Sequence, residues 1–189
     1  LNYFEKNISS DIIVHSNITE ADKIPVKYLF RNFNQMPAIE KKALKLCKGL
    51  ILDIGAGAGC HSSWLQKKGF QVIANEISPG CIEVLKKRKI NQILNKDINL
   101  VENIKVDTIL LLMNGLGLAR ELKQLPDFLI HLKKLLNPEG QILLESTDIS
   151  YMFEEGEYDL NFKSKNKYYG EVCYQMEYEN IRGKKFNWL

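Results

Sequence analysis

The chain has 189 residues, of which 45% are hydrophobic and 26% are charged, and its formal net charge is +3. This length predicts one domain with a single hydrophobic core, and the composition excludes a disordered or fibrous protein. The small net charge, with lysines spread over predicted helices, gives no strong signal for nucleic-acid binding. The longest apolar run, Thr108–Met113, has the length of a buried strand, so we expect no membrane partner.

The four cysteines are far apart in the sequence: Cys47, Cys60, Cys81 and Cys173. None of them pair at C-x-x-C spacing or stand near a histidine at ligand spacing, so we predict no metal site. Isolated thiols without a signal peptide favour a reducing compartment, and we expect a cytoplasmic protein.

Strand-like and helix-like patterns alternate through residues 37–150, after a polar N-terminal segment (1–36) that we expect to form a cap. Pro37 begins the first helix, and Gly49 ends it. Strands are predicted at residues 50–54, 71–75, 91–95, 106–113 and 141–147, with helices at about 60–68, 79–89 and 121–136. This alternation predicts an α/β fold with a doubly wound, mainly parallel, Rossmann-like sheet that has helices on both faces.

The pattern changes in residues 151–189, which we expect on the substrate side of the fold. An aromatic and polar stretch predicts a loop over one end of the sheet. Its prominent aromatic side chains are Tyr151, Phe153, Tyr168 and Tyr169. Residues 171–180 and 184–189 then predict an antiparallel hairpin near the C-terminus. Because the chain starts at Leu1 and stops within a strand-like pattern, we expect a fragment of a longer protein.

The most informative run is LILDIGAGAG, residues 50–59, in which an apolar strand ends in three glycines at alternate positions. A strand that turns through glycines into a helix lets a nucleotide-like ligand approach bare backbone. The dinucleotide fingerprint G-x-G-x-x-G would require a third glycine at position 60, which is Cys60. The spacing here is G-x-G-x-G, with Asp53 two residues before Gly55. Both features argue against the alternative of an NAD-dependent oxidoreductase.

A polar side chain follows each of the next three predicted strands, namely Glu76, Asp97 and Asn114. The carboxyl ends of parallel strands are where open α/β sheets bind ligands. Together with the glycine run, this pattern resembles the class I S-adenosylmethionine (SAM)-dependent methyltransferases of the small uncharacterised bacterial type. The resemblance covers roughly residues 37–147, and it implies SAM as the cofactor and S-adenosylhomocysteine (SAH) as its product. The usual sheet of that family has seven strands, so its C-terminal part is expected to be missing here.

The resemblance also implies roles for the glycine-loop residues. Gly55, Ala56 and Gly57 would border the methionine part of SAM, and Asp53 would accept N–H groups from beneath the loop. A tight turn with no ligand is the structural alternative.

Further cofactor contacts are implied at the next strand ends. Glu76 would accept hydrogen bonds from both ribose hydroxyls, and Ile77 would pack on the adenine. Asp97 and the backbone of Ile98 would read the adenine amino group, and Asn114 would lie where the methyl group is transferred. A surface carboxylate, a loop cap and an Asn-Gly turn are the structural alternatives for Glu76, Asp97 and Asn114.

The fourth predicted strand ends in NGLG, residues 114–117, where adenine-amino methyltransferases of DNA and RNA carry an Asn/Asp-Pro-Pro-aromatic tetrad. The absence of both prolines and the aromatic residue disfavours methylation of adenine by that mechanism. We therefore predict a methyltransferase with a small-molecule acceptor, and a non-catalytic SAM-binding module is the alternative. A homo-oligomer paired through an exposed sheet edge also stays open.

No catalytic residue can be identified from the sequence, because methyl transfer with a neutral leaving group depends mainly on alignment. A base is needed only where the acceptor must lose a proton, and His15, His61 and Tyr28 are conceivable bases. His131 is expected at the surface, and Arg31 is a candidate partner for the SAM carboxylate.

Overall fold

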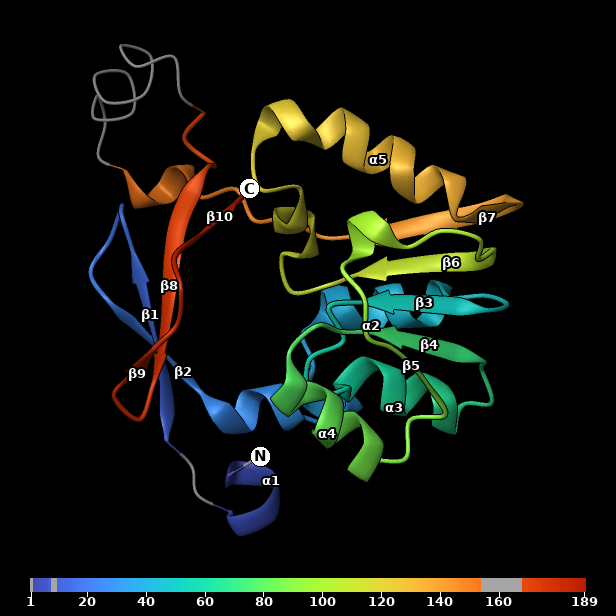
Figure 1. Ribbon diagram of the computed structural model, residues 1–189, viewed down its shortest axis with the longest axis horizontal. Helices are drawn as coiled ribbons and strands as arrows, with labels where there is room; N and C mark the ends of the chain where they lie inside the picture. Colours follow the sequence, from blue (N-terminus) through green and yellow to red (C-terminus); the bar gives the residue numbers. More distant parts are fainter. Residues whose placement is uncertain (1, 8–9, 154–167) are drawn as a thin grey trace.

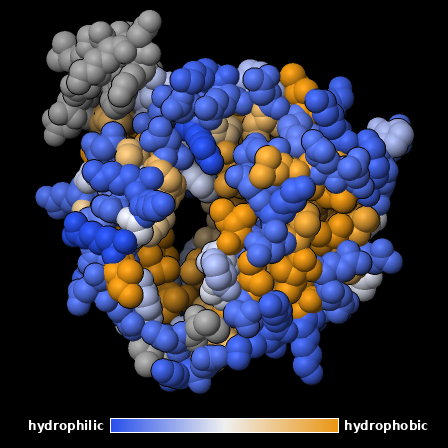
Figure 2. Space-filling view, in the orientation of Figure 1, coloured by the Kyte–Doolittle hydropathy of each residue, from blue (hydrophilic) through white to orange (hydrophobic). Residues whose placement is uncertain are grey.

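Two five-stranded sheets, one parallel and one antiparallel, form the frame of this protein (Figure 1). The computed structural model describes residues 2–7, 10–153 and 168–189. The parallel sheet comes from the middle of the chain, and the antiparallel sheet combines residues from near both of its ends. Figure 2 shows a hollow between the two halves of the molecule, with hydrophobic atoms along part of its rim.

The parallel half alternates between strands and helices. Its elements are α2 (Ala38–Leu46), β3 (Ile51–Ile54), α3 (Cys60–Lys67), β4 (Val72–Asn75), α4 (Pro79–Lys87), β5 (Gln92–Leu94), β6 (Val106–Leu111), α5 (Leu125–Lys134) and β7 (Leu136–Leu144). The antiparallel half contains β1 (Asp11–Ser16), β2 (Asp22–Pro25), β8 (Val172–Tyr178), β9 (Ile181–Arg182) and β10 (Phe186–Trp188). The remaining helical segments are α1 (Asn2–Lys6), η1 (Val26–Phe30), η2 (Phe33–Gln35), η3 (Ile98–Leu100), η4 (Gly115–Ala119), η5 (Leu122–Gln124) and η6 (Ser150–Met152).

The parallel sheet has the strand order β5-β4-β3-β6-β7, with β3 at its centre. The chain moves outward from β3 to β5 and then returns to the other side of β3 to form β6 and β7. All four strand pairs are parallel, which confirms the predicted doubly wound α/β fold. Ligands bind such sheets outside the carboxyl ends of the strands, where the direction of winding changes, here between β3 and β6.

Helices cover both faces of the parallel sheet, as predicted. On one face, Leu52 of β3 belongs to a buried cluster with Phe128 and Leu132 of α5. On the other face, Ile51 belongs to a cluster with Leu44 of α2 and, from α3, Leu65. Consecutive residues of β3 thus pack on opposite layers, because side chains alternate along a strand.

The fifth parallel strand begins earlier than predicted. We expected it at residues 141–147, after an Asn-Pro-Glu-Gly turn, and it spans Leu136–Leu144. Leu136 already pairs with Val106, and the register shifts between Val106 and Thr108. Because β7 is an edge strand, it accommodates the proline and the irregularity that a central strand would not.

The preceding helix is shorter than predicted. The sequence pattern placed it at about 121–136, whereas α5 begins at Leu125 after the short turn η5. Pro126 lies in the first turn of α5, where a proline does not remove a helical hydrogen bond. The helix therefore begins at the position that its proline favours.

The antiparallel sheet confirms the predicted C-terminal hairpin and adds two strands that the sequence analysis did not find. Phe186 of β10 pairs with Tyr174 of β8, and β9 pairs with the other end of β8. The additional strands are β1 and β2, in the N-terminal segment, and β1 pairs with β8 through Ile13 and Glu177. The N-terminal segment is therefore part of the same sheet as the C-terminal hairpin.

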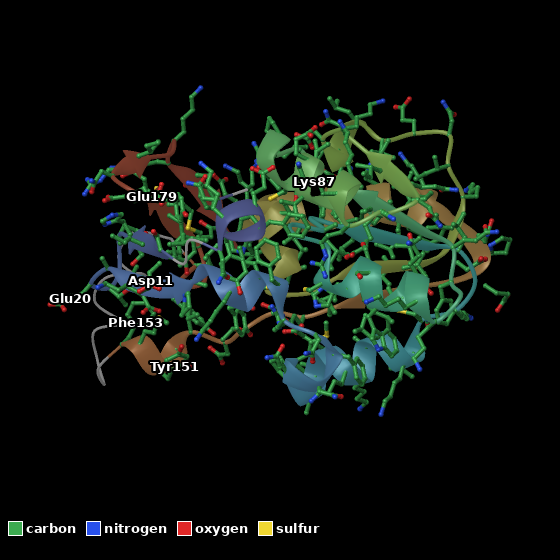
Figure 3. The ribbon with its side chains drawn as sticks, turned by 90° about the horizontal axis from the view of Figure 1, so that it is seen from below. Asp11, Glu20, Lys87, Tyr151, Phe153 and Glu179 are labelled. Carbon is green, nitrogen blue, oxygen red and sulfur yellow. The ribbon has the colours of Figure 1, made fainter. Side chains whose placement is uncertain are left out.

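Helix α1 is connected to the parallel half by an ion pair between Glu5 and Lys87, whose charged atoms are 2.8 Å apart. Figure 3 shows Lys87 on α4, whereas Tyr151 and Phe153 lie at η6 on the side of the antiparallel sheet. This ion pair is exposed, so it contributes little to stability. Within the described ranges, every helix is too short or too polar to cross a membrane.

Candidate cofactor site

The glycine run forms the loop between β3 and α3, and its glycines have different functions. Gly55 and Gly59 both have positive φ angles, +67° and +76°. A Cβ built on Gly55 would meet no atom within 4 Å, so the backbone there borders open space. A Cβ on Gly59 would lie 2.6 Å from Cδ2 of Leu85 in α4. Gly59 thus permits close packing of two helices, and Gly55 leaves room for a ligand.

Glu76 holds the glycine loop from the end of the neighbouring strand β4. Its Oε2 accepts a hydrogen bond from the backbone N–H of Gly57 at 2.8 Å. Its Oε1 accepts hydrogen bonds from the N–H groups of Ile77 and Ser78, at 2.8 and 2.9 Å. A carboxylate oxygen has two lone pairs, so Oε2 can also accept a hydrogen bond from a ligand hydroxyl.

Two further residues, to which the sequence analysis gave no role at the site, support the same loop. Arg88, just after α4, donates a hydrogen bond from Nη1 to the carbonyl oxygen of Ala58 at 2.6 Å. The carbonyl of Asn75 accepts a hydrogen bond from the N–H of Ala56. The loop is therefore fixed from α4 and β4 before any ligand binds.

Asp53 lies buried beneath the loop, as predicted for a residue that accepts hydrogen bonds there. Its Oδ2 accepts a hydrogen bond from the hydroxyl of Ser62 at 2.5 Å. Burial raises the pKa of the Asp53 carboxyl. The nearby His61 and the hydrogen bond from Ser62 partly offset this rise. Asp53 thus connects β3 to the first turn of α3 and does not line the cavity described below.

A buried ionic network lies next to this loop, and Arg31 and His61 are both part of it. Arg31 donates from Nη2 to both carboxylate oxygens of Glu40, and the Nε2 atom of His61 lies 2.6 Å from Glu40 Oε2. Burial alone would lower the pKa of His61, but contacts with Cys60 and Glu40 raise it to about 10. Arg31 therefore has a carboxylate of the protein as its partner, contrary to the expectation that it pairs with the SAM carboxylate.

A cavity of about 530 Å³, here called the cofactor cavity, opens at the carboxyl ends of the parallel strands. It contains five of the predicted cofactor-binding residues: Gly55, Glu76, Ile77, Asp97 and Ile98. Its volume falls within the range of ordinary small-molecule sites. The structure thus brings together residues from the ends of three neighbouring strands, as expected for a ligand site in this fold.

The three residues that were expected to contact adenine differ in their surroundings. Ile77 is 62% exposed, so its side chain is accessible to a ligand. Asp97 caps the turn η3 by accepting hydrogen bonds from the backbone and side chain of Asn99 at 2.9 and 3.0 Å. Ile98 is buried in the core, and its carbonyl contacts Nε2 of His131 at 2.8 Å. His131, which we expected at the surface, is therefore half-buried, and it contacts a residue that lines the cofactor cavity.

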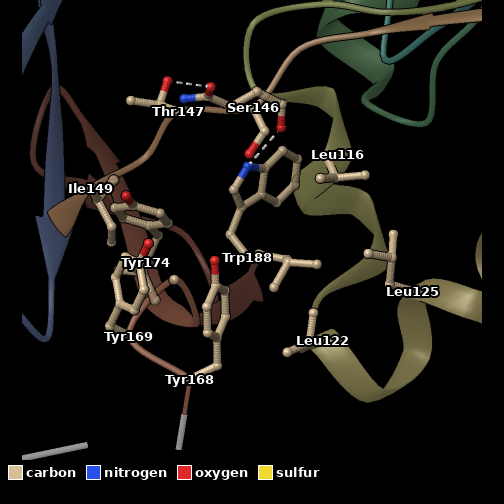
Figure 4. Close-up of a pocket in the computed structure, with 14 residues that line it drawn as sticks. Leu116, Leu122, Leu125, Ser146, Thr147, Ile149, Tyr168, Tyr169, Tyr174 and Trp188 are labelled. Carbon is tan, nitrogen blue, oxygen red and sulfur yellow. Dashed lines mark hydrogen bonds between the residues drawn. The ribbon is translucent and has the colours of Figure 1, made fainter.

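Asn114 does not line the cofactor cavity and lies instead in a smaller neighbouring one (Figure 4). Its backbone adopts a left-handed conformation with φ +59°. Its carbonyl accepts a hydrogen bond from Nε1 of Trp188 at 3.1 Å, and its Oδ1 accepts one from Thr147 at 2.7 Å. Trp188 lines both cavities, so the two meet at this residue.

Basic residues next to β10 and η4 complete the cofactor cavity, and the sequence analysis missed them. Lys184 and Lys185 directly precede β10, and Arg120 directly follows η4. Arg120 has φ +67° and ψ −51°, a conformation that residues other than glycine rarely adopt. No local sequence signal marks these residues, because they reach the cavity only through the packing of β10 against η4.

The three conceivable bases do not line either cavity. His15 is on β1, 3.0 Å from Glu177, and His61 is in the buried ionic network. Tyr28 lies beneath the guanidinium of Arg31, 4.1 Å from the ring centre. Among the described residues no group of His, Cys, Asp and Glu has the arrangement of a metal site.

Comparison with known proteins gives the family. Residues 27–188 match the methyltransferase domain family. A SAM-dependent methyltransferase from Bacteroides fragilis, solved in complex with SAH, is 39% identical over 100% of this chain and 76% of that chain, with a TM-score of 0.88. An amino pentose methyltransferase from Micromonospora echinaspora, solved with bound SAM, is 15% identical and covers 76% of this chain and 64% of that chain. Its TM-score of 0.52 supports the fold alone.

A curated relative matches over a shorter range. The mitochondrial ubiquinone biosynthesis O-methyltransferase of Schizosaccharomyces pombe is 31% identical over 101 residues, which are 51% of this chain. The match spans only 37% of the length of the yeast protein. Taken with the fold and the glycine loop, these similarities leave no support for the NAD-dependent alternative, and the chain belongs to the family of SAM-dependent methyltransferases.

Proposed function

We propose that this chain binds SAM in the cofactor cavity and transfers its methyl group to a small-molecule acceptor. The observation that carries the proposal is the convergence of the open backbone at Gly55 with the carboxylates of Glu76 and Asp97 on one cavity. SAM combines a ribose diol, an adenine amino group and an amino-acid part, and these residues offer acceptors and bare backbone suited to each. The similarity of this chain, over its whole length, to 76% of a methyltransferase solved with SAH supports the same ligand.

The proposed contacts follow the residues that line the cavity. Glu76 would accept a hydrogen bond from a ribose hydroxyl through Oε2 while it holds the N–H of Gly57. Asp97 and the backbone of Ile98 would contact the adenine amino group, and the exposed side chain of Ile77 would pack on its ring. Gly55 would border the methionine part of SAM, where a side chain would occupy ligand space.

The contribution of the protein to catalysis would be alignment. Bound SAM supplies an electrophilic methyl group on a sulfonium, and its leaving group is neutral. The rigid loop and the indole of Trp188 would fix the direction from which an acceptor approaches. Holding two reactants in line provides much of the acceleration in reactions of this kind.

The acceptor side and the compartment are also part of the proposal. The small net charge gives no support to a nucleic-acid acceptor, and the second cavity has the size of a small molecule. All four cysteines are free thiols, which supports a reducing compartment such as the cytoplasm.

Transfer of a labelled methyl group tests this function. The protein is incubated with a small-molecule extract and with SAM that carries a labelled methyl group. We expect the label to appear in small-molecule products and not in protein. Glu76→Ala should reduce this labelling, and Glu83→Ala, which changes an exposed glutamate on α4, should not. If SAH binds but no extract yields a labelled product, the non-catalytic SAM-binding module is the better description.

A further inference from the structure

A second cavity, of about 140 Å³, shares the lining residue Trp188 with the cofactor cavity. Figure 4 shows Trp188 among the residues that line this second cavity. The position of the indole is fixed by its hydrogen bond to the carbonyl of Asn114 and by close packing on η4. A Cβ built on Gly117 would lie 1.9 Å from Nε1 of Trp188, so only glycine fits there. We refer to this space as the aromatic cavity.

Among the described residues, the side chains that line the aromatic cavity are uncharged at neutral pH, since none is an aspartate, glutamate, lysine, arginine or histidine. Moving a charged group from water into such a site without an opposite charge is strongly unfavourable. The cavity therefore selects against carboxylates and phosphates, and the carboxylates of Glu145, Glu171 and Asp148, each hydrogen-bonded to a lining residue, add to this selection.

The size and shape of the lining indicate a single ring. Tyr168, Tyr169, Tyr174 and Trp188 contribute aromatic side chains, which stack well on planar ligands. A cavity of about 150 Å³ in another protein is large enough to hold benzene, which is close to the volume found here. The aromatic cavity thus has room for one six-membered ring.

The polar groups in the lining suit a hydroxyl. Thr147 donates a hydrogen bond to Oδ1 of Asn114, which orients the amide so that its NH₂ group faces away from Thr147. This NH₂ group has two N–H donors, which can donate to the oxygen of a ligand hydroxyl. The hydroxyl of Tyr169 donates to Oδ1 of Asp148 at 2.9 Å, so its oxygen is oriented by a carboxylate outside the lining.

We propose that the aromatic cavity binds the methyl acceptor and that this acceptor is a single-ring compound that has a hydroxyl group and no carboxylate or phosphate. The assignment rests on the proposed function, because the methyl donor must occupy the cofactor cavity. In the transfer, a lone pair of the hydroxyl oxygen forms the new bond to the methyl carbon as the bond between that carbon and sulfur breaks. SAH leaves as a neutral thioether, and the hydroxyl proton passes to solvent water.

Calorimetric titration of the SAH-saturated chain tests the assignment without requiring turnover. The probes are phenol and catechol, with 4-hydroxybenzoate and 3,4-dihydroxybenzoate as their carboxylated counterparts. We expect saturable binding of the neutral compounds and at least about tenfold weaker binding of the carboxylates. Leu122→Lys adds a positive charge at a lining position that is 44% exposed, and it should reduce or reverse this preference. Ile130→Lys, at a 54% exposed position on α5 outside the lining, is the matched control and should leave it unchanged.

Three results would overturn the assignment. The first is that no neutral ring compound binds to the SAH complex, and the second is that neutral and carboxylated rings bind equally well. The third is an equal effect of Leu122→Lys and Ile130→Lys. Failure of SAH itself to bind is a distinct outcome, which would overturn the proposed cofactor site together with the acceptor assignment that rests on it.

Discussion

The carboxylate of Glu76 and the backbone N–H of Gly57 are joined by a hydrogen bond of 2.8 Å, which connects the end of β4 to the glycine loop after β3. The residue proposed to bind the ribose is thus also the residue that fixes the loop. Ligand binding and loop order therefore depend on one side chain.

Replacing Glu76 by alanine should weaken SAH binding by roughly 1–3 kcal/mol, because both the ribose acceptor and the acceptor for the Gly57 N–H are lost. Glu83→Ala on α4 is the control, since Glu83 only pairs with the exposed Lys86. Titration calorimetry measures both variants. Equal affinities for Glu76→Ala and the unchanged chain would remove Glu76 from the site.

Gly55→Ala and Gly69→Ala form a matched pair for the open side of the loop. Both glycines have positive φ, and a Cβ on either would meet no atom within 4 Å. Each substitution should cost about 1–2 kcal/mol in the free energy of unfolding, because alanine is strained in this conformation. Only Gly55→Ala should also weaken SAH binding, since its Cβ would project into the cofactor cavity. Similar SAH affinities for the two variants would contradict this placement.

Gly117→Ala should displace Trp188, which lines both cavities. Its Cβ would collide with the indole of Trp188, so we expect a loss of about 1–3 kcal/mol in the free energy of unfolding. Gly80→Ala in α4 has open space around its Cβ and should instead be neutral or stabilising by about 0.4–1 kcal/mol. Urea unfolding, followed by tryptophan fluorescence, compares the two. A Gly117→Ala variant as stable as Gly80→Ala would show that Trp188 does not pack on η4.

Protonated His61 should stabilise the fold in a defined pH range. Its pKa is about 10 in the folded chain, above the ordinary value of 6.5, so the stabilisation is complete below pH 6.5 and is lost as the pH rises through about 10. Glu40 has a lowered pKa, so it stays charged throughout this range. His61→Gln removes the titrating group, and the difference in unfolding free energy between it and the unchanged chain should shrink from pH 6.5 to pH 10. If the unfolding free energies of His61→Gln and the unchanged chain change with pH in parallel, His61 does not carry a proton in the folded protein.

Local sequence patterns were sufficient to predict which strand-end residues meet at the cofactor cavity. The glycine spacing and the acids at positions 76 and 97 lie directly after strands, and parallel strands bring their carboxyl ends to one edge of a sheet. The order of the strands does not need to be known for this inference. The convergence of Gly55, Glu76 and Asp97 could therefore be predicted.

Contacts between distant parts of the chain could not be predicted in this way. Asn114 was expected at the cofactor, but its left-handed conformation and the indole of Trp188, 74 residues away, place it in the aromatic cavity. Arg31 was expected to pair with the SAM carboxylate, and only the structure shows that Glu40 is its partner. Strand β1 has no strong alternation of buried and exposed residues, because most of its side chains are only half-buried.

Titration of the chain with SAH and, separately, with NAD⁺ is the most direct test of the central claim. The account predicts one SAH site per chain, with affinity lowered by Glu76→Ala, and no binding of NAD⁺. Binding of NAD⁺ in place of SAH, or SAH binding that is insensitive to Glu76, would contradict the proposed cofactor site.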